Sequence, residues 1–174
     1  MHRHARFTPQ HHGAPLRGLS IRLATVEDSL AISAIELADG LPDSEPLIRA
    51  ELASIAQGNL LRQSWVAEHQ GGVLAYGRCS LRGAPEPPCA LPPGWYLSGL
   101  RVHPTCRRRG VGRALVQARL HWVFARAARC YYYTHPRNRS SVALHAPFGF
   151  VELDPAVPTG RSDGPSRLFV LDRA

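Results

Sequence analysis

The chain has 174 residues, of which 44% are hydrophobic and 20% charged, and this size and composition predict one globular domain with a proper core. The net charge is +8, and no apolar run approaches the 18 residues that a membrane-spanning helix needs, so we expect no membrane association. The four cysteines lack C-x-x-C spacing and a histidine partner, so we expect no metal site and reduced thiols in a cytoplasmic protein.

Residues 1–18 hold four of the nine histidines but show no periodic apolar pattern, so we expect a disordered His/Arg-rich tail ahead of one domain over residues 19–174. Thr25 is placed to cap the first helix, with Asp28 in the capping-box position. Hydrophobic periodicity predicts strands at 19–23, 65–68, 73–81, 95–102, 130–134, 150–153 and 167–171, and helices at 26–38, 46–56, 111–128 and 140–146. This order of elements indicates the α/β (α+β) class.

The stretch 97–113 is the most informative part of the chain. An alternating apolar strand is ended by Pro104, three arginines follow, and a helix begins at Val111 between Gly110 and Gly112. The first N–H groups of a helix have no internal partner and carry the positive end of the helix dipole. Glycine allows the backbone to approach a phosphate closely, so the stretch predicts a diphosphate site at the start of this helix.

Two better-known phosphate motifs do not fit this stretch. A dinucleotide fingerprint needs a third glycine where the chain has Leu115, and an acidic residue about 20 positions on, whereas no Asp or Glu occurs between Arg101 and Val151. A P-loop needs a lysine, and this chain contains none.

The stretch instead resembles the pyrophosphate-binding motif of the GNAT superfamily of acyl-CoA-dependent N-acetyltransferases, in which a strand ending in V-x-P precedes R/Q-x-x-G-x-G/A. A second motif of that family also stands at the expected distance. The first motif is met by Val102, Pro104, Arg107, Gly110 and Gly112, and the second by Asn138, Ser141, Leu144, Gly149 and Phe150. The resemblance covers residues 19–174 and implies a single mixed, mostly antiparallel sheet flanked by helices, with two splayed central strands.

The resemblance also implies a reaction and a cofactor site. Acetyl-CoA donates its acetyl group to a primary amine that attacks directly in a ternary complex, and no metal takes part. Backbone groups of Leu100 and Val102 pair with the pantetheine arm, a bulge at Gly99 aims an N–H at the thioester, and N–H groups of 108–113 hold the diphosphate. The expected cofactor-binding residues are Leu100, Val102, Arg107, Arg108, Arg109, Gly110, Val111, Gly112, Arg113, Asn138 and Ser141. Asn138 is also placed to be the N-cap of the helix that follows it, so a capping role is its second interpretation.

The catalytic residues are less strongly indicated. His145 occupies the position where many family members have a tyrosine that protonates the departing thiolate, so a proton-donor role for His145 is one hypothesis and core packing the other. Tyrosines 131–133 or water are alternative donors. Glu68 is the expected general base, with His103 and Tyr96 as alternatives and a solvated turn carboxylate as the plain interpretation of Glu68.

Charge is sharply divided along the chain. Residues 27–51, the acidic block, contain seven acids and one arginine, while residues 101–139, the basic block, contain ten arginines and no acid. The basic block predicts an anionic partner such as coenzyme A, and the acidic block favours a cationic ligand such as a protonated amine, with solvated surface charge as the alternative. A small-molecule or peptide amine is therefore the expected partner, and a homodimer is left open. An acyl-CoA sensor without catalysis and a nucleic-acid-binding module are the competing functions.

Overall fold

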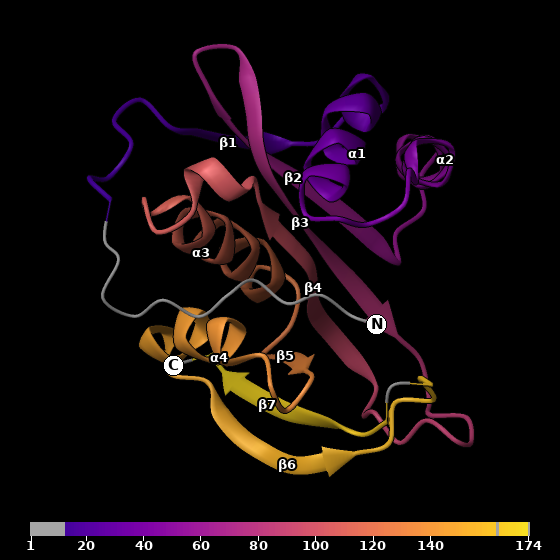
Figure 1. Cartoon of the computed structure of the whole chain (residues 1–174). Coiled ribbons are helices and arrows are strands. Elements are labelled where there is room, and N and C mark those ends of the chain that lie inside the picture. The colour runs from indigo at the N-terminus through magenta and orange to yellow at the C-terminus, as the bar shows by residue number, and fades with distance from the viewer. Residues whose placement is uncertain (1–12, 163, 174) are drawn as a thin grey trace.

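A seven-stranded sheet in the order β1-β2-β3-β4-β5-β7-β6 forms the centre of the computed structural model, which describes residues 13–162 and 164–173 (Figure 1). All neighbouring strands are antiparallel except β4 and β5. The strands are β1 (Ser20–Leu23), β2 (Arg62–His69), β3 (Gly72–Arg82), β4 (Gly94–Val102), β5 (Arg129–Thr134), β6 (Val151–Val157) and β7 (Ser166–Asp172). The predicted mixed, mostly antiparallel sheet is confirmed.

Helices cover both faces of this sheet, and the apolar residues of neighbouring strands alternate between them. On one face, Trp65 and Ala75 pack with Leu115 and Val116 in the main core. On the other face, Val66 and Tyr76 pack against the first two helices. The helices are α1 (Ser29–Ala38), α2 (Glu45–Ala56), α3 (Val111–Phe124) and α4 (Arg139–His145), with α3 and α4 on the main-core face.

The first helix begins through the predicted capping box. Thr25 and Asp28 exchange the expected contacts, with the Thr25 N–H donating to Asp28 Oδ2 at 2.8 Å. The box caps a short 3₁₀ turn, Val26–Asp28, which leads directly into α1. The prediction of Thr25 as the cap is confirmed, with one turn of tighter helix inserted before α1.

Helix α3 ends four residues earlier than predicted, at Phe124 instead of residue 128. Side chains from outside the last turn satisfy its carbonyls: Arg126 donates to the carbonyl of Trp122 at 2.9 Å, and Arg173 donates to that of Phe124 at 2.8 Å. Such contacts stabilise a helix end, and the chain then turns into β5 at Arg129. Hydrophobic periodicity alone could not locate this helix end, because Arg173 directly follows β7 and is distant in the sequence.

The predicted tail is only partly within the described residues. Residues 1–12 lie outside them, while residues 13–18 are described. The Leu16 N–H donates to the carbonyl of Arg109 at 3.2 Å, and the Leu16 side chain packs at the edge of the main core. This last part of the predicted tail therefore contacts the loop before α3.

A buried arginine of α3 lies beneath the centre of the sheet. The Arg119 side chain is fully buried, and its guanidinium donates to the carbonyls of Arg78 on β3 and Ser98 on β4 at 3.0 and 3.1 Å. The register of β3 against β4 shifts between Tyr76 and Arg78, at the position of Gly77. A Cβ at Gly77 would lie 3.0 Å from Arg119 Cζ, so only glycine leaves room for this guanidinium.

We predict that Gly77→Ala lowers the free energy of unfolding by about 1–3 kcal/mol, the usual cost of overpacking a close-packed interior. The guanidinium is held at three nitrogen–carbonyl contacts and is not free to move away. Denaturant unfolding measures the change. Gly83→Ala is the matched control, because a Cβ there meets nothing within 4 Å. Equal stability of the two variants would contradict the prediction.

Candidate active site

The edge of β4 that faces β5 is open beyond Tyr96. The two strands pair at Trp95–Cys130 and Tyr96–Tyr131 and nowhere further along their described lengths, after which they diverge (Figure 1). On its other side β4 slips register against β3, and Gly99 has a φ of +56°, a conformation that glycine adopts most easily. The predicted bulge at Gly99 is confirmed, and the strand beyond it keeps backbone groups available to a ligand.

The beginning of α3 lies against the end of this open strand. Gly110 is the N-cap with a φ of +85°, and Val111 is buried in the main core. A Cβ at Gly112 would stand 3.5 Å from Leu144 of α4 and 3.6 Å from Val102 of β4. Gly112 therefore lets α3 pack closely at the meeting point of α4 and β4, with its first N–H groups directed out of the helix end.

The side chain of Arg107, in the loop before α3, makes contacts within the protein. The side chain of Arg107 donates from Nε to the carbonyl of Val102 at 3.1 Å and from Nη2 to the carboxylate of Asp39. Asp39 also binds Arg101, at 2.8 Å. The Arg107 side chain therefore fastens the loop to β4 and to the end of α1, and contact of Arg107 with cofactor stays a prediction.

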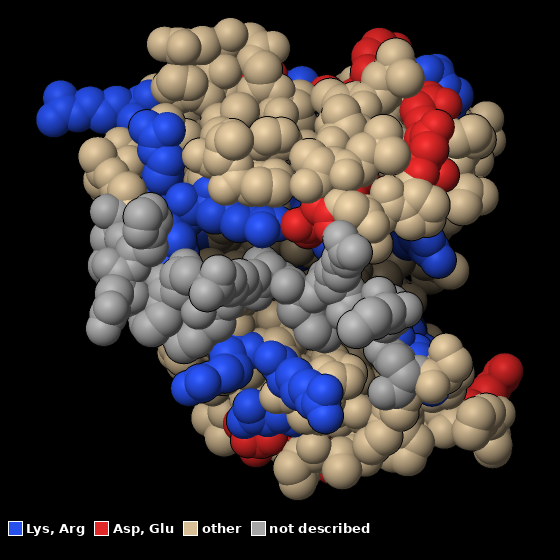
Figure 2. All heavy atoms as spheres, viewed as in Figure 1, with Lys and Arg blue, Asp and Glu red and all other residues tan. Residues whose placement is uncertain are grey.

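The remaining side chains of the loop surround the helix start. Arg109 donates from Nε to the carbonyl of Ala14 at 3.3 Å, which ties the loop to the segment before β1. Arg113 lies over the ring of Phe148 at 6.0 Å. Arg108 is exposed and has a φ of 60°. On the face seen in Figure 2, basic side chains gather around the starts of α3 and α4.

Asn138 and Ser141 act first as a helix cap. The Asn138 side chain accepts a hydrogen bond from the Ser141 N–H at 3.2 Å, which satisfies one of the unpaired donors at the start of α4. Of the two interpretations given for Asn138, the capping one is confirmed, and contact with cofactor stays a prediction for both residues.

His145 is built into the core of the α4 face. The residue is 5% exposed, and its ring stacks on Tyr132 at 4.1 Å between centroids and meets Phe150 edge to face. Nδ1 lies 2.8 Å from the carbonyl of Ser141, and because a carbonyl only accepts, Nδ1 carries the proton of the neutral ring. Nε2 has no partner among the described residues. Burial lowers the pKa of His145 to about 4.

These contacts correct the hypothesis that His145 protonates the leaving thiolate. The ring is neutral at pH 7, its N–H is occupied by Ser141, and its free nitrogen can accept a hydrogen bond but has no proton to give. Core packing, the alternative interpretation, is the one that the geometry supports.

Glu68 lies on β2, two strands away from β4. Its carboxylate binds Arg22 Nε at 2.8 Å, and the same guanidinium binds Asp28 at 2.7 Å. Glu68 pairs with Ser20 of the edge strand β1, so β3 separates it from β4. The structure does not bring Glu68 together with the open strand, which corrects its assignment as the base and leaves it the role of an ion-pair partner.

The alternative proton carriers are held by other contacts. His103 caps the short turn after β4, with Nδ1 2.8 Å from Thr105 Oγ1. The Tyr96 hydroxyl donates to the carbonyl of Pro92 at 2.7 Å. Tyr131 stacks on Tyr96 on the face away from α3.

Tyr132 differs from these residues by lying on the α4 face. Its ring is sandwiched between His145 and Phe169, at 4.1 and 4.5 Å between centroids. Burial raises the pKa of Tyr132, so its hydroxyl keeps its proton at neutral pH. It is therefore an O–H donor on the diverging part of β5.

Most carboxylates of the acidic block are engaged in ion pairs or hydrogen bonds within the protein. Its carboxylates bind arginines or hydroxyls of the same half of the molecule: Asp28 with Arg22, Glu36 with Tyr76 and Ser44, Asp39 with Arg101 and Arg107, Asp43 with Ser33, Glu45 with Ser29 and Arg49, and Glu51 with Arg62 and Arg78. The block is therefore mainly structural, and the preference for a cationic ligand that we drew from it loses its basis.

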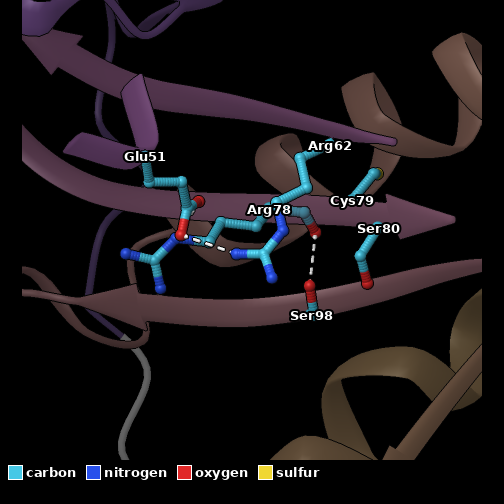
Figure 3. Close-up of a pocket in the computed structure, with 6 residues that line it drawn as sticks. All are labelled: Glu51, Arg62, Arg78, Cys79, Ser80 and Ser98. Atoms are coloured by element: carbon cyan, nitrogen blue, oxygen red, sulfur yellow. Dashed lines mark hydrogen bonds and ion pairs between the residues drawn. The ribbon is translucent and has the colours of Figure 1, made fainter. Parts of the chain in front are cut away.

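A hollow of about 130 Å³ opens on the α2 side of the bulge (Figure 3). Glu51 of α2, Arg62 of β2 and Arg78 of β3 meet here, above Ser98 of β4. The pair formed by Arg78 Nε and Glu51 Oε1 is 3.0 Å long. Our reasoning from sequence did not identify this group, because its members are far apart in the chain and carry no motif.

Two features are absent from the described part of the chain. Within residues 13–162 and 164–173, no cluster of three or more His, Cys, Asp or Glu side chains is arranged to hold a metal ion. None of the described helices combines the length and the apolarity required to cross a bilayer.

Comparison with known proteins gives a consistent result. The model of the acetyltransferase (GNAT) family matches residues 33–150. The aminoglycoside N(6′)-acetyltransferase type 1 of Klebsiella aerogenes is 32% identical over 111 residues, which cover 60% of this chain and 71% of that protein. The fold is shared with a Salmonella typhimurium protein described as an acetyltransferase and solved with acetyl-CoA, at a TM-score of 0.67 and 22% identity, covering 91% of this chain and 95% of that one. The fold is also shared with an aminoglycoside acetyltransferase solved with coenzyme A, at a TM-score of 0.67 and 20% identity, covering 90% of this chain and 95% of that one.

We predict that His145 makes the fold sensitive to acid. The unfolded imidazole takes up a proton near pH 6.5 but the buried ring only near pH 4, so stability is intact above pH 6.5 and is lost as the pH falls from 6.5 toward 4. At about 1.4 kcal/mol per pH unit the full loss is ~3 kcal/mol. Denaturant unfolding between pH 7 and pH 4.5 measures it. His145→Phe should flatten the decline, and exposed His121→Gln should not. An identical decline in His145→Phe would refute the assignment.

Proposed function

The chain belongs to the GNAT family of acetyltransferases and is an acetyl-CoA-dependent N-acetyltransferase, and we propose that it acetylates a primary amine of a small molecule by direct attack in a ternary complex. The observation that carries this proposal is the open edge of β4 beside the first turn of α3. One element offers unpaired strand groups, and the other offers the N–H groups of a helix end.

The cofactor is proposed to lie along these two elements. N–H groups of residues 108–113 hold the diphosphate, with Gly110 leaving the space in front of them clear and Gly112 allowing α3 to pack closely against α4 and β4. The pantetheine arm enters the gap between β4 and β5 and pairs with backbone groups of Leu100 and Val102, much as a strand would. The exposed side chain of Arg108 is placed to supply charge to the phosphates, while the Arg107 side chain keeps the loop in position.

The amine is proposed to approach from the α2 side, across the bulge at Gly99. Its nitrogen attacks the thioester carbon and forms the C–N bond, the C–S bond then breaks, and coenzyme A leaves as a thiolate that is protonated to the thiol. An N–H of the bulge is placed to stabilise the oxyanion that develops on the carbonyl. The proton that the nitrogen loses passes to water, since the described carboxylates of this half are already bound by arginines or hydroxyls.

The leaving thiolate needs a proton, and Tyr132 is the residue we propose to give it. Tyr132 is on β5 where this strand separates from β4, and burial keeps its hydroxyl protonated. His145 stacks on its ring and supports its position. The tyrosine that many relatives carry on the helix is thereby replaced by one on the neighbouring strand.

The nucleic-acid alternative has little support. The basic block does not present a continuous charged surface, because many of its arginines make internal contacts: Arg101 and Arg107 with Asp39, Arg119 with backbone carbonyls, Arg126 with Trp122 and Arg129 with Asp172. The free thiols of Cys79, Cys89, Cys106 and Cys130 support a reducing compartment, and we propose a cytoplasmic location.

We predict that Gly110→Val weakens acetyl-CoA binding by about 10–100-fold, because a β-branched residue strains the left-handed backbone and crowds the N–H groups of α3. Calorimetry with acetyl-CoA measures the change. Gly58→Val is the matched control: its φ is +95°, its Cβ also meets nothing within 4 Å, and it ends α2 away from the site. A folded Gly110→Val with the affinity of the native protein would remove the diphosphate site from this loop.

Tyr132→Phe should lower kcat by about 10²–10⁴-fold, the usual range for a general acid, with the KM for acetyl-CoA and the Tm almost unchanged. The ring and its stacking remain, and only the hydroxyl is lost. Steady-state kinetics provide the measurement, and Tyr133→Phe is the control one position along β5. Native kcat in Tyr132→Phe would show that water protonates the thiolate.

A further inference from the structure

Arg78 directs a partly free guanidinium at the bulge of β4. It faces the α2 side of β3, opposite Ser98, and its side chain is 23% exposed. Its Nη1 lies 3.1 Å from the point that a Cβ on Gly99 would occupy. The end of this side chain therefore reaches the residue whose backbone bends β4 beside the proposed acetyl group.

Only one edge of this guanidinium is in use. Nε binds Glu51, and Cζ lies over the ring of Tyr76, 4.8 Å from its centroid. Neither terminal nitrogen has a hydrogen-bond partner among the described residues. A guanidinium has five N–H donors in a fixed fork, and the two terminal nitrogens together match the two oxygens of a carboxylate.

The surroundings of the hollow have an excess of positive charge. Arg62 binds the second oxygen of Glu51 at 3.2 Å, so two arginines share one carboxylate. At the end of α1, Asp39 is likewise shared by two arginines, Arg101 and Arg107, while Glu36 is bonded to the Tyr76 hydroxyl. A polycationic amine would meet repulsion at this point, whereas an anionic group would find unused donors.

We propose that Arg78 binds a carboxylate of the acceptor, so that the substrate is an amine that also carries a carboxylate, of the amino-acid class. This inference rests on the proposed function, because it needs the amine to reach the bulge from the α2 side. The substrate differs in charge from the one named for the Klebsiella aerogenes relative, an aminoglycoside. Arg78 acts in binding and orientation and takes no part in proton transfer.

The test uses matched pairs of amines: free amino acids and the corresponding amino-acid amides, with an aminoglycoside and a polyamine as cationic members of the panel. We expect kcat/KM for the acid to exceed that for its amide by at least about tenfold, as the loss of one charge-assisted hydrogen bond implies. Arg78→Gln should remove this ratio through the KM of the acid, with the KM for acetyl-CoA unchanged. Arg78→Lys should restore part of it, because it keeps the charge but loses the fork.

The control is Arg49→Gln, an exposed arginine on α2 that pairs with Glu45, and it should keep the ratio. Equal rates with acids and amides, or a preference for the cationic amines, would overturn the inference while leaving the proposed function intact. So would an Arg78→Gln protein that loses rate equally on acid and amide, since that is the signature of a structural ion pair. Acetyl-CoA binding without transfer to any amine would instead refute the proposed function.

Discussion

The contact of one buried guanidinium with two carbonyl groups beside the bulge, one on β3 and one on β4, holds the centre of this protein together. Arg119 reaches from α3 to the carbonyls of Arg78 and Ser98, and burial lowers its pKa because no carboxylate accompanies it. A carbonyl left without a hydrogen bond in the interior would cost about 1–3 kcal/mol of stability. The contact with Arg119 therefore stabilises the bulge within the packed sheet. The bulge in turn sets the direction of β4 as it separates from β5.

Local signals in the sequence predicted the fold well. The capping box at Thr25, the glycine bulge at Gly99 and the cap at Asn138 are each decided by a few adjacent residues, and the structure has all of them. Side-chain partners across the sheet could not be found this way. Arg119 does fall on the apolar face of α3, at four residues from Leu115, and a charge at such a position was a signal that we did not use.

The errors about the site have one physical origin, which is that residue type fixes what a group can do but not which partner it has. His145 stands where a proton donor is expected, yet a helix carbonyl one turn back takes its N–H. Arg107 matches a phosphate motif, yet its guanidinium binds Asp39 and the carbonyl of Val102. Such partners come from segments that are distant in the sequence or from the geometry of a helix. The distribution of charge along the sequence reveals neither.

The positive charges of Arg78 and Arg119 help to explain why the site has no evident general base. An amine can attack only when it is neutral, and nearby positive charge lowers the pKa of an ammonium group. On the proposed placement, the amine lies close to Arg78, with Arg119 buried beneath the same bulge. Both charges favour loss of the ammonium proton to solvent, and both favour the oxyanion that follows attack. A carboxylate on the acceptor would neutralise Arg78 in part, so the buried charge of Arg119 would then be the more constant of the two effects.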